Sequence, residues 1–224
     1  MPRAQTLRRL PDVADNPTGA ANSYRAPIAF PVPIALRTLV HADGEGARHA
    51  VVVANGGRLF IVDPVPGIGA ALHELATDKI AAILLTRIGD VHAAGLSELL
   101  THRPPATPLP VFGPADVEAL VDFINDDADI YDGGLEAWGP APEIERPVIV
   151  FENDGAFVSA FASATSGALT YRFDHGQRSL VVRSDCRALA GPELAGAEVV
   201  FGGAPDVHWP VVTPGSDTLD GRSL

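Results

Sequence analysis

The chain has 224 residues, of which 46% are hydrophobic and 20% are charged. This length and composition are typical of one soluble globular domain. No apolar run reaches the roughly 18 residues that a membrane-spanning helix needs, so no membrane partner is expected. The 28 Asp and Glu residues outnumber the 16 Lys and Arg residues, and the formal net charge is −12. Because nucleic-acid binding relies on clustered basic residues, this balance argues against a nucleic-acid partner.

Location and redox chemistry follow from two local features. The basic N-terminal stretch is followed by Pro11 and Asp12 rather than by an apolar core, so it is not a secretory signal and a cytoplasmic location is expected. Cys186 is the only cysteine, which excludes an internal disulfide and a thiolate metal cluster.

Residues 115–154 carry twelve acidic side chains and one basic one. A solvated face that keeps the protein soluble is favoured there over a docking surface.

The predicted elements begin after residues 1–33, which contain several prolines and are interpreted as a loosely ordered arm. A single domain is expected over 34–204 and a tail over 205–224. Alternating and apolar patterns predict strands at 50–54, 59–63, 81–85, 109–112, 148–152, 156–162, 168–173, 179–183 and 198–201. Helices are predicted at 68–76, 93–100 and 115–125, with a brief one near 192–195. The stretch 131–147 is expected to be irregular.

The segment 83–96 is the most informative part of the chain. An apolar run ends at Thr86, a short polar turn follows, and a helix is predicted from Ala93. The turn therefore follows the carboxyl end of a buried strand, which is where α/β sheets place their ligand sites.

Several short strings, in this order along the chain, resemble segments of the metallo-β-lactamase fold superfamily, in particular its arylsulfatase-like and RNase Z-like branch. The strings are 58–63, 84–86 with His92 and 95–96, 110–114, 171–173 and 179–185. The resemblance implies an α/β fold, a metallo-β-lactamase-like αββα sandwich that here lacks part of its C-terminal half. It also implies that Asp63 orients the loop around Gly67 by hydrogen bonding.

The metal-binding signature of that superfamily is Thr-His-x-His-x-Asp-His, which holds two metal ions that share a hydroxide. Aligned on Thr86 and His92, this sequence has Arg87, Gly89 and Val91 in place of the other ligands. A further ligand histidine would fall near Thr165, where no histidine occurs. Asp185 matches the bridging aspartate.

Two ligands do not suffice for a dinuclear site, because even a catalytic zinc ion usually needs three protein ligands. The resemblance therefore implies no cofactor here, with one weakly bound zinc ion as the alternative. A permanent cation at Arg87 would repel a metal dication, and it is expected to pair with Asp90 or Asp185 instead. Asp90 is also expected to cap the helix that begins near Val91. For His92, a structural role near the helix N-terminus is favoured over catalysis.

Two functions remain open, and a third possibility is that the chain is an inactive relic or a truncated form. The first is a protein that has lost dinuclear-metal hydrolysis and binds a small molecule or a protein partner, either as a homodimer or complemented by another subunit. The second is a hydrolase or lyase acting on a small ester, thioester or lactone. Its site would be mononuclear or metal-free, with His92, Asp185, Asp90 and Arg87 as the candidate catalytic residues.

Overall fold

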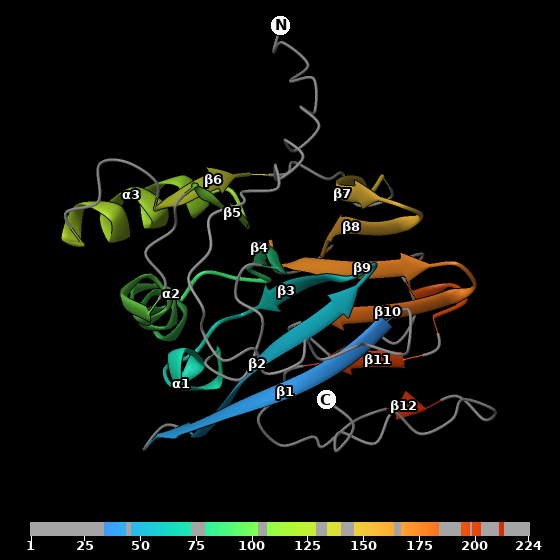
Figure 1. The fold of residues 1–224 in the computed structure, drawn as a ribbon, viewed down its shortest axis with the longest axis horizontal. Helices are drawn as coiled ribbons and strands as arrows, with labels where there is room; N and C mark the ends of the chain where they lie inside the picture. The colour runs from blue at the N-terminus through green and yellow to red at the C-terminus, as the bar shows by residue number, and fades with distance from the viewer. Residues whose placement is uncertain are drawn as a thin grey trace, which may run out of the picture.

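The structure is a computed structural model, and it describes residues 34–43, 46–72, 79–102, 107–128, 134–139, 146–163, 167–183, 194–197, 199–202 and 211–212. Two six-stranded sheets pack face to face, and three helices cover the other face of the first sheet (Figure 1). None of the helices within these ranges is long and apolar enough to span a bilayer.

The first sheet has the order β1-β2-β3-β4-β5-β6. Its strands are β1 (Ile34–Asp43), β2 (Gly46–Asn55), β3 (Arg58–Val62), β4 (Ile80–Leu84), β5 (Leu109–Phe112) and β6 (Leu135–Trp138). The first three strands pair antiparallel, whereas β3 to β6 pair in parallel. Because parallel strands need crossover connections, the helices α1 (Ile68–Leu72), α2 (Asp90–His102) and α3 (Val117–Asp127) follow β3, β4 and β5.

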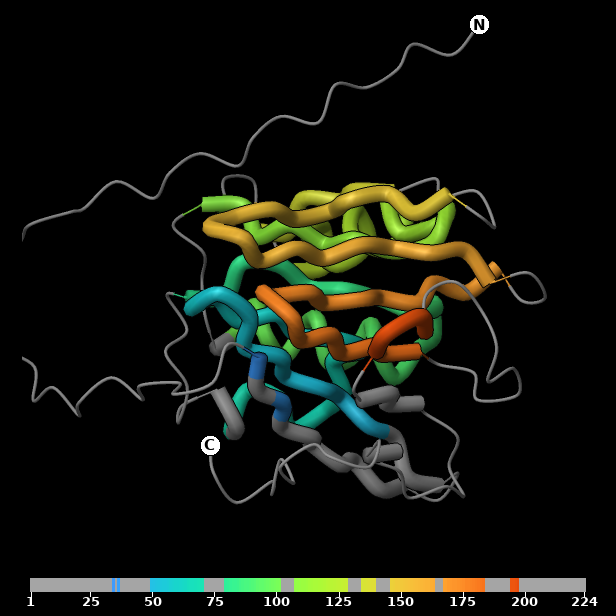
Figure 2. The backbone as a smooth tube through the Cα atoms, turned by 90° about the vertical axis from the view of Figure 1, so that its right-hand side faces the viewer, coloured from blue at the N-terminus to red at the C-terminus, as the bar shows by residue number. Residues whose placement is uncertain are grey.

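The second sheet has the order β12-β11-β10-β9-β8-β7. Its strands β7 to β10 lie side by side in Figure 2, coloured from yellow to orange. Its strands are β7 (Val148–Asn153), β8 (Ala156–Ala162), β9 (Leu169–His175), β10 (Arg178–Arg183), β11 (Val199–Gly202) and β12 (Val211–Val212). All neighbours pair antiparallel except β10 and β11. The layers seen in the described residues are therefore helix, sheet and sheet, in the order that the predicted sandwich requires.

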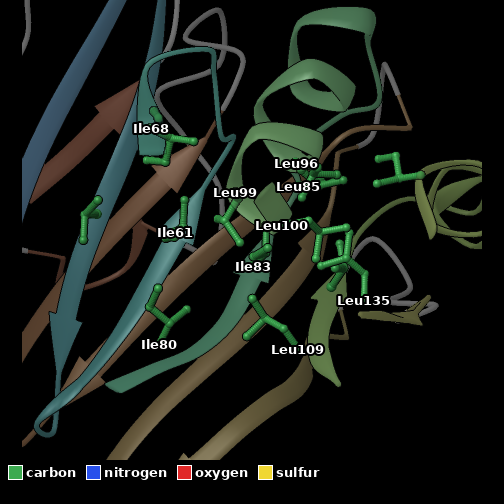
Figure 3. Packing of buried hydrophobic residues seen from close by; sticks show 14 of the residues in the cluster. Ile61, Ile68, Ile80, Ile83, Leu85, Leu96, Leu99, Leu100, Leu109 and Leu135 are labelled. Carbon is green, nitrogen blue, oxygen red and sulfur yellow. The ribbon is translucent and has the colours of Figure 1, made fainter. Parts of the chain in front are cut away.

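Two apolar clusters hold the layers together, and they divide the first sheet by the alternation of its side chains. In β2, Ala50, Val52 and Ala54 pack on the helix side, whereas Val51 and Val53 pack between the sheets. Both faces of the strand are buried, which explains its nearly continuous apolar sequence. On the helix side, Leu96, Leu99 and Leu100 of α2 lie against residues of β3 to β5 (Figure 3). Each such side chain contributes about 1.5–3 kcal/mol when it is fully buried.

The structure differs from the sequence-based expectations in four places. No strand was predicted over β1, which pairs with β2 over its whole length, and α2 begins at Asp90 rather than at Ala93. Leu135–Trp138 forms β6 within the stretch expected to be irregular, since it pairs with β5 over its whole length. Val211–Val212 forms β12 against β11, so this part of the predicted tail joins the second sheet. The helix predicted at 68–76 is described only as Ile68–Leu72, and residues 73–78 lie outside the described ranges.

Candidate functional site

The parallel strands β3 to β6 bring their carboxyl ends to one edge of the first sheet, which we call the carboxyl edge. Asp63, Thr86 and Gly113 follow β3, β4 and β5 there. Backbone hydrogen bonds hold these ends side by side: Asp63 N donates to Leu84 O at 3.0 Å, and Leu85 N donates to Phe112 O at 2.7 Å. The turn that the sequence singles out, residues 86–90, therefore lies at this edge, as predicted.

Asp63 fixes the start of that turn. Its backbone has a positive φ of 51°, and its carboxylate accepts hydrogen bonds from Thr86 N at 2.7 Å and from Thr86 Oγ1 at 2.6 Å. Both carboxylate oxygens are thus used within the protein. The expectation that Asp63 orients the loop around Gly67 is wrong, because its carboxylate bonds the next strand end instead of that loop.

The loop around Gly67 is held by Glu98 of α2. The Glu98 carboxylate accepts from Gly67 N at 2.6 Å and from Gly69 N at 3.1 Å. A carboxylate suits this position because the first N–H groups of a helix, here α1, have no partner within the helix.

His92 lies in the first turn of α2 and is only 3% exposed. Its Nδ1 lies 3.1 Å from Pro64 O. Because a carbonyl oxygen can only accept, this geometry assigns a proton to Nδ1. Nε2 is buried and has no hydrogen-bond partner among the described residues. The Cδ2 atom of the ring would lie 3.9 Å from a Cβ atom at Gly89, so this corner of the ring lies by the turn.

Arg87 and Asp90 are both exposed at the turn, and the structure shows no ion pair between these two described residues. The helix begins at Asp90 itself, and Gly89 O accepts from the N–H groups of His92 and Ala93. Asp90 is therefore a first-turn residue rather than the residue before the helix, and its negative charge suits that end of the helix dipole. Asp185, the fourth candidate, lies outside the described residues, as does Thr165.

Burial dominates the electrostatics behind the turn. It raises the pKa of Asp63 above its usual value of 3.8, against the opposing effects of the nearby His92, the hydrogen bonds from Thr86, and Arg87. Burial also raises the pKa of Tyr171 well above 10.0, and the charge of Asp63 raises it further. The Tyr171 hydroxyl lies 3.0 Å from Leu85 O and 3.1 Å from Phe112 O, so it remains a neutral donor to the strand ends.

Among the described residues, the donor set at the carboxyl edge does not fit a dinuclear metal centre. In the segment 87–92, Arg87 supplies a cation, Gly89 and Val91 supply no side-chain ligand atom, and Asp90 and His92 supply one candidate each, a carboxylate and Nε2. In the described ranges, no three His, Cys, Asp or Glu side chains gather closely enough to hold a metal ion.

The sequence predicts a turn followed by a helix from Ala93, whereas in the structure the helix begins at Asp90, so Arg87 lies in the turn and Asp90 and His92 lie at the start of α2. It missed the roles of Thr86, Glu98 and Tyr171. The only sequence signal for Tyr171 was its place in the string 171–173, which says nothing about contacts with the strand ends.

Solved structures provide the comparison with known proteins. Human tRNase Z, short form, is similar with a TM-score of 0.56 and 14% identity, over 75% of this chain and 76% of that one. The zinc-bound PqqB from Methylobacterium extorquens gives a TM-score of 0.52 and 18% identity, over 69% of this chain. The metallo-β-lactamase fold protein YhfI from Bacillus subtilis gives 0.51 and 15%, also over 69%.

The chain spans 56% of PqqB and 64% of YhfI. No protein-family model matches the sequence, and a search of curated proteins gives no match either. At these identities the similarity concerns the arrangement of strands and helices and leaves the chemistry open. The order of the strands, the helices between them and these structural matches agree, and together they show that this chain has the metallo-β-lactamase fold.

Proposed function

We propose that this chain is a metallo-β-lactamase-fold protein without a dinuclear metal centre, which binds a small molecule at the carboxyl edge instead of hydrolysing it through metal ions. One observation carries the proposal: Arg87, Gly89 and Val91 occupy the turn that follows β4, and none of them is a metal ligand. A dinuclear centre needs ligands from this turn for both ions.

The surroundings of the turn support the same proposal. The Arg87 guanidinium carries a permanent positive charge and opposes a dication at short range. Asp63 is no substitute ligand, because both of its carboxylate oxygens accept hydrogen bonds from Thr86. His92 alone is far short of the three protein ligands that a catalytic zinc ion usually has.

Metal analysis of the purified full chain tests the proposal, with a variant that restores the ligands as its control. The variant combines Arg87→His, Gly89→His and Val91→Asp. We expect the wild-type protein to carry less than about one metal ion per chain and the variant to carry more, because three ligands are added at the turn. About two equivalents of zinc, iron or manganese in the wild-type protein would contradict the proposal.

A second candidate function, an esterase, thioesterase or lactonase with a mononuclear or metal-free site, is favoured by the state of His92. Its Nδ1 is fixed by Pro64 O, and its buried Nε2 has no partner among the described residues. A histidine held in this way suits a general base or a single metal ligand. Asp185, Asp90 and Arg87 would complete such a site.

Turnover of a panel of esters, thioesters and lactones tests this second candidate. If the protein is such an enzyme, His92→Ala and Asp185→Ala abolish turnover while the folded fraction measured by circular dichroism stays unchanged. Turnover that is absent in the wild-type protein, or that survives both substitutions, rejects it.

We further propose that the protein works as a homodimer or with a complementing subunit. The apolar side chains of Ile149 on β7 and Phe123 on α3 are 42% and 64% exposed, and an interface over either element would cover one of them. Light scattering of the full chain measures its mass. A monodisperse monomer over a range of concentrations would reject the homodimer.

A further inference from the structure

The outward face of α3 presents an aromatic ring to solvent. Val117, Val121 and Ile124 are buried and pack on the first sheet. The side chain of Phe123 lies on the other side of the helix and is 64% exposed. Figure 1 shows α3 at the outer end of the helix layer, beyond α2. Aromatic side chains are enriched in protein interfaces, so this ring marks the outward face of α3 as a surface for a partner.

The charges on this face are all of one sign. Glu118, Asp122 and Asp126 follow one another at intervals of four residues, so they line one side of the helix, and all three are exposed. Asp126 and Asp127 also lie one turn after Phe123. The helix itself contains no Lys or Arg. The ring is therefore surrounded by carboxylates without a cation on the same helix.

This arrangement is unfavourable for an isolated helix. Like charges four residues apart repel each other across one turn, as Glu118 does with Asp122 and Asp122 with Asp126. Carboxylates in the last turn also meet the negative end of the helix dipole, where a cation is favoured. A face that only kept the protein soluble would not need the ring of Phe123 among these charges. A partner that brings cations and apolar side chains together would relieve the repulsion and cover the ring.

The chain itself contains a segment of this chemistry, which lies outside the described ranges. Residues 1–10 have three arginines and two leucines but no acidic side chain: Arg3, Leu7, Arg8, Arg9 and Leu10. Residues 115–154, which include α3, have twelve acidic side chains and one basic one. The two segments are therefore complementary in charge, and both carry apolar side chains between their charges.

The length of the chain allows residues 1–10 to reach α3. Residues 11–33 separate them from the start of β1. A stretch of this length spans up to about 75–80 Å when it is extended. This exceeds the diameter of a domain of this size, which is on the order of 45 Å. The covalent connection also keeps the segment at a high effective concentration near α3, so that weak contacts suffice.

We propose that residues 1–10 dock on the outward face of α3 of the same chain. Their arginines lie beside its carboxylates, and their leucines pack against Phe123. This inference goes beyond the proposed function and does not depend on the chemistry of the carboxyl edge. A homodimer would then use another surface, such as β7 around Ile149.

Paramagnetic labelling of the full chain tests the contact. The label is attached to Thr6→Cys, in a chain in which Cys186→Ser removes the only natural cysteine. We expect the label to broaden the backbone amide signals of residues 119–127 in NMR spectra. The signals of α1, at the opposite end of the helix layer, should stay sharp (Figure 1). Sharp signals from α3, or equal broadening of α1 and α3, would overturn the proposal.

A mixture of two kinds of chain separates docking within one chain from docking between copies. One kind carries the paramagnetic label at natural nitrogen abundance, and the other carries ¹⁵N without the label. We expect sharp α3 signals in the mixture. Broadened α3 signals would mean that the segment binds another copy, which overturns the assignment to the same chain.

Single substitutions test the charges. Arg9→Gln and Asp122→Asn should each weaken docking by about threefold, as read from the backbone amide shifts of α3, because each removes one exposed ion pair. NaCl at about 0.5 M should weaken it as well. The matched controls are Arg25→Gln, outside the segment, and Glu152→Gln, exposed on β7, and both should leave docking unchanged. Equal weakening by the controls would reduce the effect to net charge and overturn the proposal.

Phe123→Ala tests the apolar part of the surface. The side chain is exposed, so the variant should fold as the wild type does. We expect docking to weaken by about fivefold or more, because the leucines of the segment lose their contact. Docking that is unchanged in Phe123→Ala would overturn the assignment to this face.

Discussion

Asp63 joins two neighbouring strand ends through a single side chain. It follows β3, and both of its oxygens accept from Thr86, the second residue after β4. The positive φ of 51° at Asp63 is uncommon for a residue with a side chain, and Asp tolerates it better than most. The burial that surrounds this carboxylate raises its pKa above 3.8. Asp63 therefore positions the turn, and the burial of its negative charge costs free energy.

The pH dependence of stability follows from that raised pKa. The folded protein binds the proton of Asp63 more tightly than the unfolded chain does. The resulting stabilisation is fully present at pH values below 3.8, the pKa of Asp63 in the unfolded chain. It is lost as the pH rises through the higher pKa of Asp63 in the folded protein.

We predict that Asp63→Asn removes this loss, because the amide does not ionise. The free energy of unfolding, measured by urea titration at a series of pH values from about 3.5 upward, should fall less steeply in the variant. Asp154→Asn is the matched control, since Asp154 also has a positive φ, of 47°, but is exposed. Parallel pH profiles for wild type and Asp63→Asn would contradict the prediction.

At the scale of elements, one face of α2 holds the segment that follows β3. His92 Nδ1 meets Pro64 O, Gly95 packs on the same backbone, and Glu98 accepts from Gly67 N. The spacing of three residues repeats along one side of a helix, so these contacts share a face. The apolar residues of α2 lie on a neighbouring face and pack on the sheet (Figure 3).

Gly95→Ala should destabilise the protein although alanine is the better helix former. A Cβ atom at Gly95 would lie 2.6 Å from Pro64 C and 2.7 Å from Val65 N, which are backbone atoms and cannot rotate away. We expect a cost of about 1–3 kcal/mol in urea unfolding, against a gain of about 1 kcal/mol from helix propensity. Gly89→Ala, whose Cβ would meet His92 Cδ2 at 3.9 Å, should cost less. Equal losses in the free energy of unfolding for the two substitutions would contradict this prediction, because they would mean that α2 shifts to make room for the Cβ atom at position 95.

Glu98→Ala should loosen the loop before α1. The N–H groups of Gly67 and Gly69 lose their shared acceptor, at an expected cost of about 1–2 kcal/mol. Amide hydrogen exchange at these two glycines should become faster. Glu118→Ala on the exposed side of α3 is the control and should change neither stability nor exchange there. Unchanged exchange in Glu98→Ala would contradict the assignment.

At the scale of the whole molecule, β9 ties the second sheet to the carboxyl edge of the first. Leu169 N donates to Thr86 O at 2.7 Å, and the Tyr171 hydroxyl reaches the carbonyl groups of Leu85 and Phe112. At the opposite end, Asn55 Nδ2 donates to Phe157 O at 3.2 Å. The two sheets therefore meet through polar contacts at both ends and through apolar packing between them.

Tyr171→Phe isolates the hydroxyl contact between the sheets. The ring is fully buried and keeps its packing, whereas the carbonyl oxygens of Leu85 and Phe112 lose the single hydroxyl proton that they share. We expect a loss of about 1–3 kcal/mol in the free energy of unfolding, with the urea m-value unchanged. A loss below about 0.5 kcal/mol would mean that the hydroxyl does not join the sheets.

Much of the fold could be predicted from local patterns. The strands around Val52, Ile83 and Val158 have the predicted type, and their bounds differ by a few residues. The short strand β6 was not predicted, because four residues carry too little periodicity. Their pairing with β5 creates the strand. The turn at Arg87 was also predicted, since its residues are adjacent in the chain.

The sequence by itself determined the order of most elements and the absence of a His or Asp side chain at positions 87, 89 and 91, because both depend on neighbouring residues. Only the tertiary structure decided which groups meet. Asp63 and Thr86 are 23 positions apart, and Tyr171 and Leu85 are 86 apart. No local pattern specifies such pairs, since their proximity results from the packing of whole sheets and helices. The tertiary structure also decided that His92 Nε2 is buried without a hydrogen-bond partner among the described residues, because burial exists only in the folded chain.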